Sequence, residues 1–452
     1  MTSSTDQQTG LAPVSASERI QTIDVLRGFA LLGILLVNMH FFYKPIMEAF
    51  NVDADALSPL GYGVEWFIGF FAQGKFYPLF SFLFGLGFAV QLTRAEARGG
   101  PFKRTYALRI FILLVIGVLH GTLIWAGDIL TMYAIMGFVM LLLFMFKRLL
   151  ELPFKRKDGT RRRIPFWIVL LFAALFFALP LQMFSFWVGS VQEAQALQEA
   201  GAELTPQQQE FIKQIEQQQQ YTSPEAQEQA RYAYGEGSWL EATKQRSQDF
   251  ALMLSGLPLA GWFVLCMFLI GAVFGRLNLI GRASEFKGLF VTLLVLGVAV
   301  GMPLSWQYTG LYFETNLMKP GPEMLKANQL NMFAGLFMSL MFVAAITLLM
   351  QTGASKWLGK LAPMGRMALT NYLLQSFIST FVFYGYGLGF FGQIGPVTAF
   401  IYAIVFWSLQ IPLSIWWMNR YAFGPVEWLW RTLTYMKRQP MKLANRDPVT
   451  IA

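Results

Sequence analysis

Long apolar stretches dominate the chain and alternate with short polar segments. About twenty consecutive apolar residues in helical form cross the hydrocarbon core of a bilayer. The pattern predicts ten such spans, which begin near Val25, Trp66, Ala107, Ile129, Ile164, Phe250, Gly288, Asn328, Met367 and Val397. Backbone groups must be paired inside hydrocarbon, and the stretches lack the alternation of barrel strands. We therefore expect an all-α, polytopic membrane helix bundle.

Two connections between the spans are unusual. Residues 125–128 (WAGD) leave room only for a tight turn between the third and fourth spans, whereas residues 192–249 form a large acidic, glutamine-rich loop. The loop is interpreted as a small helical cap or as a tolerated surface insertion; the insertion is favoured because long loops accept insertions at little cost. The predicted organisation is a disordered cytoplasmic tail (1–18), five spans (19–190), the loop (191–249), five more spans (250–419) and an amphipathic segment with a tail (420–452).

Composition supports a membrane protein. The chain is 55% hydrophobic and 13% charged, with a mean hydropathy of +0.46. Soluble domains carry about a quarter charged residues, and disordered chains need a polar composition, so both classes are excluded. One cysteine rules out an internal disulfide framework and a cysteine-built metal site, and two histidines leave little for a histidine-rich one. No metal is expected.

Basic residues indicate the orientation of the bundle. With the N-terminus inside, the inner segments hold most of the 35 Lys and Arg residues but only about a third of the 26 Asp and Glu residues. The densest cluster lies at residues 155–163. Both termini are therefore predicted to be cytoplasmic. Because basic inner loops are usual in such proteins, the pI of about 9.5 indicates contact with membrane lipid and no nucleic-acid partner.

Five polar side chains are predicted to lie at comparable depth toward the outer side of the membrane. Counting 1.5 Å per residue along the alternating spans places Asn38, His40, Lys75, His120 and Asp128 there. Burying such groups in a membrane is costly, so they mark a candidate site.

The cluster suggests acid–base chemistry. His120 suits a general base because the pKa of histidine lies near neutrality, and Asp128 would orient its imidazole. Lys75 or Asn38 would hold an anion or a developing oxyanion. The alternative is structural: each group is satisfied by a neighbouring helix, Asp128 caps the fourth span, and His40 lies at the membrane interface.

Further polar residues lie toward the inner side. Asp24 and Arg27 are one turn apart, which favours an ion pair, although Arg27 also suits a phosphate from the cytoplasm. Arg366 opens the ninth span, where Asn371 and Gln375 share a face directed into the bundle. Residues 423–431 (FGPVEWLWR) form an aromatic, amphipathic segment that is expected to anchor at the interface.

Five segments together resemble the YeiB family, bacterial inner-membrane proteins with a domain of unknown function. They are residues 24–38 (DVLRGFALLGILLVN), 74–87 (GKFYPLFSFLFGLG), 120–137 (HGTLIWAGDILTMYAIMG), 365–375 (GRMALTNYLLQ) and 424–431 (GPVEWLWR). His120 and Asp128 match the His and Asp of that pattern. The opening segment, with Arg27 and Asn38, is also distantly similar to transmembrane acyltransferases of the heparan-α-glucosaminide N-acetyltransferase type. His40 does not match the histidine of that group, because its spacing from Asn38 differs.

The resemblance implies a homodimer in the bacterial inner membrane and an acyl group taken from cytoplasmic acyl-CoA, with no covalently bound cofactor. Arg27, with Arg104 and Arg109, would hold the coenzyme A phosphates, and His120 with Asp128 would deprotonate the acceptor. Two other hypotheses stay open at this point. In the first, the protein is a transporter or lipid-handling protein in which the same polar cluster binds a translocated anion or proton. In the second, the chain is a non-catalytic membrane module of a larger assembly.

Overall fold

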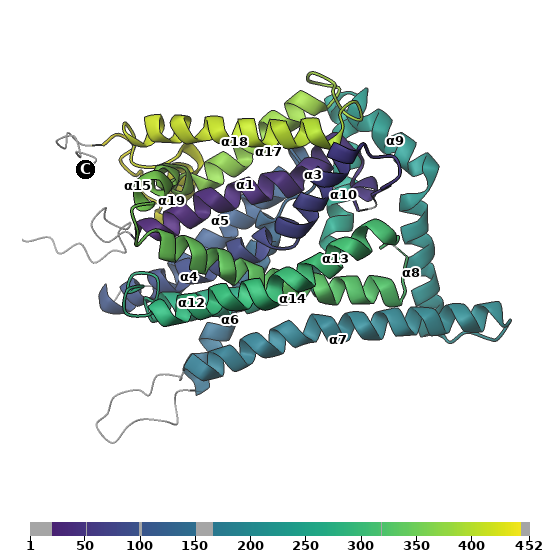
Figure 1. The fold of residues 1–452 in the computed structure, drawn as a ribbon, viewed down its shortest axis with the longest axis horizontal. Coiled ribbons are helices and arrows are strands. Elements are labelled where there is room, and N and C mark those ends of the chain that lie inside the picture. The colour runs from purple at the N-terminus through teal and green to yellow at the C-terminus, as the bar shows by residue number, and fades with distance from the viewer. Residues whose placement is uncertain (1–19, 51, 99–101, 151–165, 318, 444–452) are drawn as a thin grey trace, which may run out of the picture.

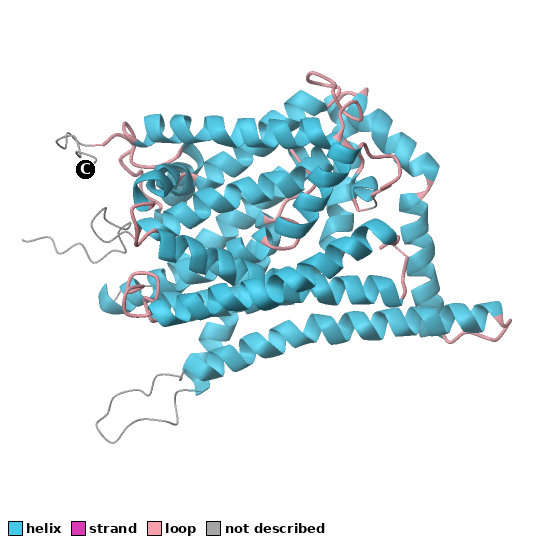
Figure 2. Cartoon of the chain, in the orientation of Figure 1, coloured by secondary structure: helices cyan, strands magenta, loops and turns pink. Residues whose placement is uncertain are grey.

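The protein is described by a computed structural model that covers residues 20–50, 52–98, 102–150, 166–317 and 319–443. Within these residues the regular structure is helical, apart from one antiparallel bridge between Tyr421 and Lys442 (Figure 2). The first half contains α1 (Gln21–Tyr43), α2 (Ile46–Ala49), α3 (Pro59–Phe71), α4 (Phe76–Arg98), α5 (Phe102–Leu123), α6 (Leu130–Leu150) and α7 (Phe166–Glu199). The large loop supplies α8 (Pro206–Thr222), α9 (Pro224–Gly235) and α10 (Trp239–Ser255).

The second half continues the bundle. It contains α11 (Leu257–Arg276), α12 (Lys287–Leu296), α13 (Met302–Glu314), α14 (Pro322–Leu349), α15 (Ser355–Leu358), α16 (Ala362–Arg366), α17 (Ala368–Phe383), α18 (Pro396–Met418) and α19 (Pro425–Tyr435). A π-helical stretch, Gly297–Gly301, joins α12 to α13 without a break in the helix axis (Figure 1). The expected all-α polytopic bundle is confirmed.

Eight helical stretches of the described chain are long and apolar enough to cross a membrane. They coincide with the predicted spans except those near Ile129 and Met367. The first of these positions holds α6, whose apolar stretch is Leu130–Met145, and the second holds the 16-residue helix α17. The sixth span begins at Leu257 rather than near Phe250. Phe250 belongs to α10, a separate polar helix that starts with a capping box at Ser238.

The second span is broken into two helices. α3 ends at Phe71 and α4 begins at Phe76, with Gly74 at a φ of +78° between them. The break exposes carbonyl groups of α3 that hydrocarbon cannot satisfy. Lys75 Nζ donates to the Gly69 carbonyl at 2.9 Å, and Ser305 Oγ donates to the Phe70 carbonyl at 2.6 Å. Residues of the break and of α13 therefore complete the end of α3.

Small residues bring the central helices together. α1 lies at the centre of the bundle (Figure 1). Gly365 of α16 approaches it so closely that a side-chain Cβ at this position would lie 1.8 Å from the Asp24 carbonyl oxygen, which only a glycine can avoid. α4 and α11 approach in the same way: a Cβ on Gly85 would lie 1.9 Å from the Phe268 carbonyl oxygen, and one on Gly271 would lie 1.9 Å from that of Phe82. Such contacts let dispersion forces hold helices that lipid does not drive together.

The glutamine-rich loop packs against the end of the bundle. α7 continues through Glu199, and α8, α9 and α10 follow it across one end of the molecule (Figure 1). Arg246 of α10 is fully buried and donates to the Leu123 carbonyl at the end of α5. The Tyr234 hydroxyl donates to Asp249 at 2.6 Å, and the Tyr234 carbonyl accepts from Gly385 N at 2.7 Å. The second half of the loop is thus part of the core, in contrast to the favoured surface insertion.

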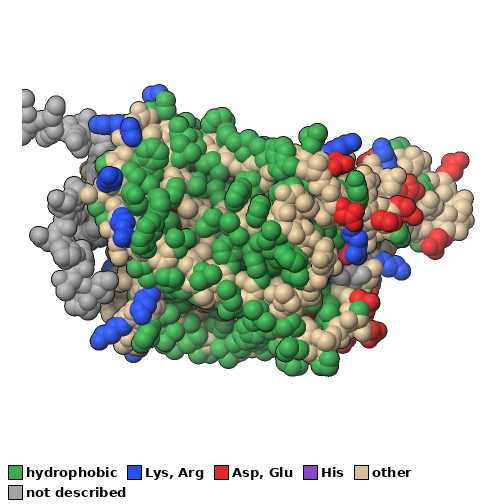
Figure 3. Space-filling view, turned by 90° about the horizontal axis from the view of Figure 1, so that it is seen from above, with side chains coloured by type: hydrophobic (Ala, Val, Ile, Leu, Met, Phe, Trp, Pro, Cys, Tyr) green, Lys and Arg blue, Asp and Glu red, His purple; other side chains and the backbone are tan. Residues whose placement is uncertain are grey.

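Charge is divided between the two ends of the bundle. Figure 3 shows Lys and Arg side chains at the end where α15 and α19 lie. The opposite end carries the Asp and Glu side chains together with several Lys and Arg side chains, and a green apolar belt lies between the two ends. The division follows the predicted alternation of basic and acidic segments. The tail 1–18, the basic cluster at 155–163 and residues 444–452 lie outside the described residues.

Candidate functional site

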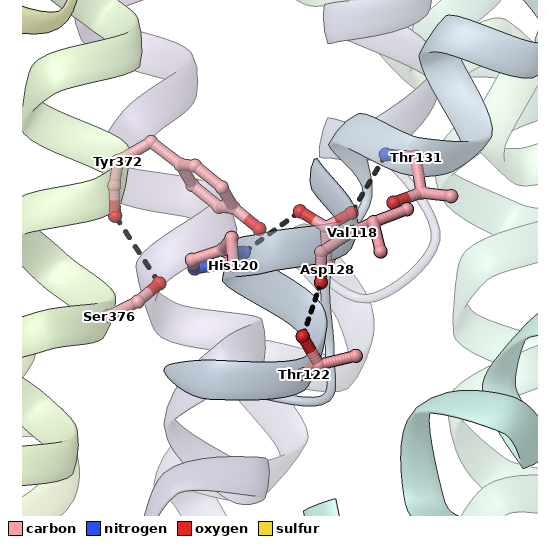
Figure 4. Close-up of polar contacts among 7 residues, drawn as sticks. All are labelled: Val118, His120, Thr122, Asp128, Thr131, Tyr372 and Ser376. Carbon is pink, nitrogen blue, oxygen red and sulfur yellow. Dashed lines mark hydrogen bonds and ion pairs between the residues drawn. The ribbon is translucent and has the colours of Figure 1, made fainter. Parts of the chain in front are cut away.

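A buried histidine–aspartate pair lies where α5 turns into α6. His120 Nδ1 is 2.8 Å from Asp128 Oδ1, and both side chains are almost fully buried (Figure 4). The second carboxylate oxygen accepts from Thr131 N at 2.7 Å and so caps α6. Gly117 permits this contact, since a Cβ there would lie 2.6 Å from Thr131 N. The carboxylate both caps a helix and orients the imidazole.

The pair leaves one imidazole nitrogen available. A carboxylate partner favours the proton on Nδ1, which makes Nε2 the basic nitrogen. Nε2 of His120 is buried and has no hydrogen-bond partner. The Tyr372 ring lies across the imidazole with its centroid 5.2 Å away (Figure 4). The histidine is therefore arranged as a base behind a tyrosine ring.

A cavity of about 340 Å³ runs from the basic end of the bundle to the opposite side of this tyrosine. At the basic end its wall includes Asp24, Arg27, Arg94, Arg109, Arg366 and Arg431. Its middle is apolar, with Leu83, Phe84 and Leu113, and its inner end is closed by Ile34, Ile129 and Tyr372. The cavity therefore combines a cationic mouth with an apolar interior.

Helix α19 forms one side of the mouth. The Trp430 indole donates to the Arg109 carbonyl at 2.8 Å, and the Arg109 guanidinium lies 3.8 Å from the ring centroid. The Glu427 carboxylate accepts from Leu369 N at 2.8 Å and Thr370 N at 3.0 Å, which caps α17. Burial raises the pKa of Glu427, against the lowering by its hydrogen bonds. The segment expected as an interfacial anchor is thus also a wall of the cavity.

A second, smaller cavity of about 80 Å³ lies beyond the tyrosine. It is lined by Ile34, Val37, Asn38, Ala72, Gly74, Phe76, Tyr77, Gly127, Ile129 and Tyr372. Ile34, Ile129 and Tyr372 therefore separate the two cavities. Asn38 and Gly127 bring α1 and the α5–α6 turn together here, next to Asp128.

The five predicted outer residues do not form one cluster. His120 and Asp128 pair, and Asn38 lines the cavity beside them, whereas His40 Nε2 lies 2.6 Å from the buried Glu65 of α3. Lys75 lines neither cavity and lies 5.0 Å from the Tyr308 ring centroid. Equal depth did not bring these side chains together because each helix turns its polar group toward a different neighbour.

Asn371 and Gln375 join α17 to α18. The Asn371 amide donates to Ser414 Oγ at 3.1 Å, and the Gln375 amide donates to Gln410 Oε1 at 2.8 Å. The Gln410 amide in turn donates to the Asn371 carbonyl at 3.1 Å. All these side chains are buried and point into the bundle, as predicted, and their contacts are structural.

Charged residues predicted toward the inner side of the membrane lie at the large cavity rather than in contacts that only join helices. Arg27 and Asp24 form the predicted ion pair at 3.0 Å, and the Arg27 side chain is still about one-third exposed. Arg27, Asp24, Arg109 and Arg366 all line the large cavity. Within the described residues no group of three His, Cys, Asp or Glu side chains is arranged to hold a metal.

Comparison with known proteins places the chain in a family. The family described as "Protein of unknown function (DUF418)" matches residues 274–437. "Uncharacterized protein YxaH" of Bacillus subtilis is 31% identical over 95% of this chain and 98% of its own length. "Uncharacterized protein YeiB" of Escherichia coli is 29% identical over 94% of this chain and 98% of its own length. No solved structure matches significantly. The chain belongs to the YeiB family of DUF418 proteins.

The structure of this YeiB-family protein adds residues that sequence reasoning missed. Arg94 and Arg431 join the cavity mouth, Tyr372 separates the cavities, and Glu65 is the partner of His40. Arg94 and Arg431 lie in the basic inner segments, and Tyr372 lies between Asn371 and Gln375. Only Glu65 carried a clear signal, because it is an acidic residue in an otherwise apolar stretch.

Proposed function

We propose that this YeiB-family protein is a transmembrane acyltransferase of the bacterial inner membrane. It takes an acyl group from cytoplasmic acyl-CoA and transfers it to an acceptor in the membrane or on its outer side. The observation that carries the proposal is the large cavity, which joins an arginine-lined mouth to the tyrosine covering the His120–Asp128 pair.

The mouth suits the phosphates of coenzyme A. Guanidinium groups bind phosphate oxygens in a bidentate manner and keep their charge when partly buried. Arg27, Arg94 and Arg431 come from three different helices and line one cavity. The apolar interior beyond them suits the pantetheine arm and the acyl group, which carry no charge. The basic end of the bundle is assigned to the cytoplasm, where acyl-CoA is made.

The His120–Asp128 pair suits the transfer step. His120 Nε2 takes a proton from the acceptor hydroxyl or amine, and the acceptor atom attacks the thioester carbonyl carbon. A new C–O or C–N bond forms, the C–S bond breaks, and the thiolate of coenzyme A leaves with the proton returned by His120. Asp128 stabilises the imidazolium between these events. The Tyr372 side chain must turn aside for Nε2 to reach the thioester.

Native mass spectrometry of the purified protein with acyl-CoA tests donor binding. The Arg27→Ala variant is expected to weaken acyl-CoA binding by roughly tenfold to a hundredfold, since a lost charged hydrogen bond costs about 1.5–3 kcal/mol. His120→Ala is expected to bind acyl-CoA like the wild type but to yield no acylated product. Arg282→Ala is the control, because Arg282 is exposed on an inner loop and its contacts are local, with Glu285 and the Phe286 ring. Absence of acyl-CoA binding by the wild type would contradict the proposal.

Lipid handling is the second candidate, and the same cavity favours it. An arginine mouth above an apolar interior also suits the phosphate and acyl chains of an anionic phospholipid. This function predicts lipid or anion movement across proteoliposomes that is lost in His120→Ala, with no covalent product. A covalently acylated acceptor in the same vesicles would exclude it.

A further inference from the structure

The small cavity beyond Tyr372 limits the size of a ligand that extends past the inner end of the large cavity. Both cavities share Ile34, Ile129 and Tyr372, so the inner end of one is the wall of the other. The Tyr133 hydroxyl, on the side of the large cavity, donates to the Tyr77 carbonyl at 2.8 Å across this wall. A chain that enters from the arginine mouth reaches the small cavity once the Tyr372 side chain turns aside.

The size of the small cavity sets the length of chain that it accepts. A volume of about 80 Å³ is about half of the roughly 150 Å³ of a buried apolar cavity that holds one benzene molecule, so the small cavity has room for about three carbon atoms. Well-packed helices around it resist enlargement, since inserting extra methylenes into a packed interior is costly. The α3–α4 break supplies Ala72 and Phe76 to this wall, and α1 supplies Val37.

The chemistry of the small cavity selects against charge. None of its lining residues is acidic or basic, and most are aliphatic or aromatic. Lys75, although next to Gly74, turns to the Gly69 carbonyl and away from the cavity wall. A carboxylate placed here would lose its water and find no cationic partner among the lining residues, which is unfavourable.

We infer that the small cavity is the acyl-group pocket, and that it restricts the donor to short, uncharged acyl groups of about two to four carbons. The inference rests on the proposed function and adds its substrate class. The thioester carbonyl lies at the Ile129–Tyr372 wall, and the remaining acyl carbons occupy the space between Val37 and Ala72. Acetyl, propionyl and butyryl groups fit; hexanoyl, octanoyl and succinyl groups do not.

A series of acyl-CoA thioesters tests the inference on the purified full-length protein. Dissociation constants are measured by native mass spectrometry for free coenzyme A and for its acetyl, propionyl, butyryl, hexanoyl, octanoyl and succinyl thioesters. Each methylene that enters the pocket is expected to tighten binding about fourfold up to butyryl, and longer chains are expected to bind more weakly. Butyryl- and succinyl-CoA form a matched pair of equal carbon number, and the butyryl thioester is expected to bind at least tenfold more tightly.

Two opposite variants make the test independent of the wild-type series. Val37→Ala removes about two methyl groups from the wall and is expected to move the best donor toward hexanoyl. Ala72→Val adds about two methyl groups and is expected to move it toward acetyl. Because the two substitutions are expected to shift the preferred acyl length in opposite directions, a general loss of folding cannot produce both results.

The possible outcomes distinguish failure of the acyl-group pocket from failure of the proposed acyltransferase function. A length optimum at butyryl or below, with opposite shifts in the variants, supports the acyl-group pocket. Binding of coenzyme A with equal affinity for every thioester, or tighter binding of octanoyl- or succinyl-CoA, overturns it and leaves the acyltransferase proposal standing. If neither coenzyme A nor any thioester binds, the proposed function fails, and the inference fails with it.

Discussion

Lys75 and His120 are both buried ionisable side chains, but their surroundings give them different roles. His120 has a carboxylate on one nitrogen and a free second nitrogen behind a tyrosine that lines both cavities. Lys75 is fully buried against the end of a broken helix, with a backbone carbonyl and the Tyr308 ring as its contacts. The surroundings favour a reactive role for the histidine and a capping role for the lysine.

A substitution distinguishes these roles for Lys75. Lys75→Met keeps the length of the side chain but leaves the Gly69 carbonyl unpaired, so we expect a loss of about 1–3 kcal/mol in stability. Acyl-CoA binding at temperatures where the variant stays folded is expected to be unchanged. Thermal unfolding in detergent measures the first effect, and native mass spectrometry measures the second. Lys360→Met, at an exposed position, is the control. Selective loss of donor binding in a variant of normal stability would restore the oxyanion-binding role predicted from the sequence.

At the scale of elements, close helix contacts depend on glycine. The α4–α11 pair contains Gly85 and Gly271, each facing a carbonyl oxygen of the partner helix. Gly310 of α13 has no atom within 4 Å of the position that a Cβ would take. Both glycines of this comparison, Gly271 and Gly310, lie inside helices, so intrinsic helix propensity favours alanine at each by a similar amount.

We therefore expect Gly271→Ala and Gly310→Ala to change the stability of the protein in opposite directions. Gly271→Ala forces α11 away from the Phe82 carbonyl and is expected to cost about 1–3 kcal/mol through overpacking. Gly310→Ala is expected to be neutral or to stabilise by about 0.5–1 kcal/mol. Thermal unfolding of the two variants in the same detergent compares them. Equal stability would show that α4 and α11 are packed less closely than described.

The contact between α19 and α17 predicts a pH dependence. Burial raises the pKa of Glu427, so the folded protein holds this proton more tightly than the unfolded chain does. The contribution of Glu427 to stability is complete below the unfolded pKa and is lost as pH rises through the folded pKa. Glu427→Gln keeps an oxygen for Leu369 N and Thr370 N but cannot ionise. We expect its melting temperature relative to wild type to increase as the pH is raised from about 4.5 toward neutrality.

A pH series of melting temperatures for the wild type and Glu427→Gln checks this expectation. Glu241→Gln is a suitable comparison, because Glu241 is exposed, caps α10 through Ser238, and has a lowered pKa. Its ionised form is the stabilising one, so its effect on stability should have the opposite pH dependence. A constant difference between Glu427→Gln and the wild type across the range would contradict the assignment.

At the scale of the whole molecule, the charge division predicts the orientation in the membrane. The only cysteine, Cys266, is buried, so introduced cysteines report their own accessibility. Glu203 lies between α7 and α8 at the acidic end of the bundle, and Lys360 lies at the basic end; both are exposed. A membrane-impermeant maleimide is expected to label Glu203→Cys in cells with a permeabilised outer membrane and Lys360→Cys only after lysis. Labelling in the reverse order would place the arginine mouth outside and exclude cytoplasmic acyl-CoA as its ligand.

The sequence by itself determined the fold class, the approximate positions of the spans and the separation of charge. These follow from the cost of placing charged groups and unpaired backbone in hydrocarbon, which acts on each segment separately. It also predicted two local pairs, Asp24 with Arg27 and His120 with Asp128, because their members are close along the chain. Arg27, Arg104 and Arg109 were predicted as phosphate ligands; Arg27 and Arg109 line the large cavity, whereas Arg104 does not.

Tertiary structure decided everything that depends on how helices are rotated against each other. Lys75 and His120 were predicted at the same depth, yet the rotation of their helices and the break at Gly74 direct them to different neighbours. The position of Tyr372 between two cavities, and the burial of Arg246 from the outer loop beside α5, involve residues more than a hundred positions apart. Depth along a helix can be counted from the sequence, but the direction of a side chain around the helix axis is fixed only by packing.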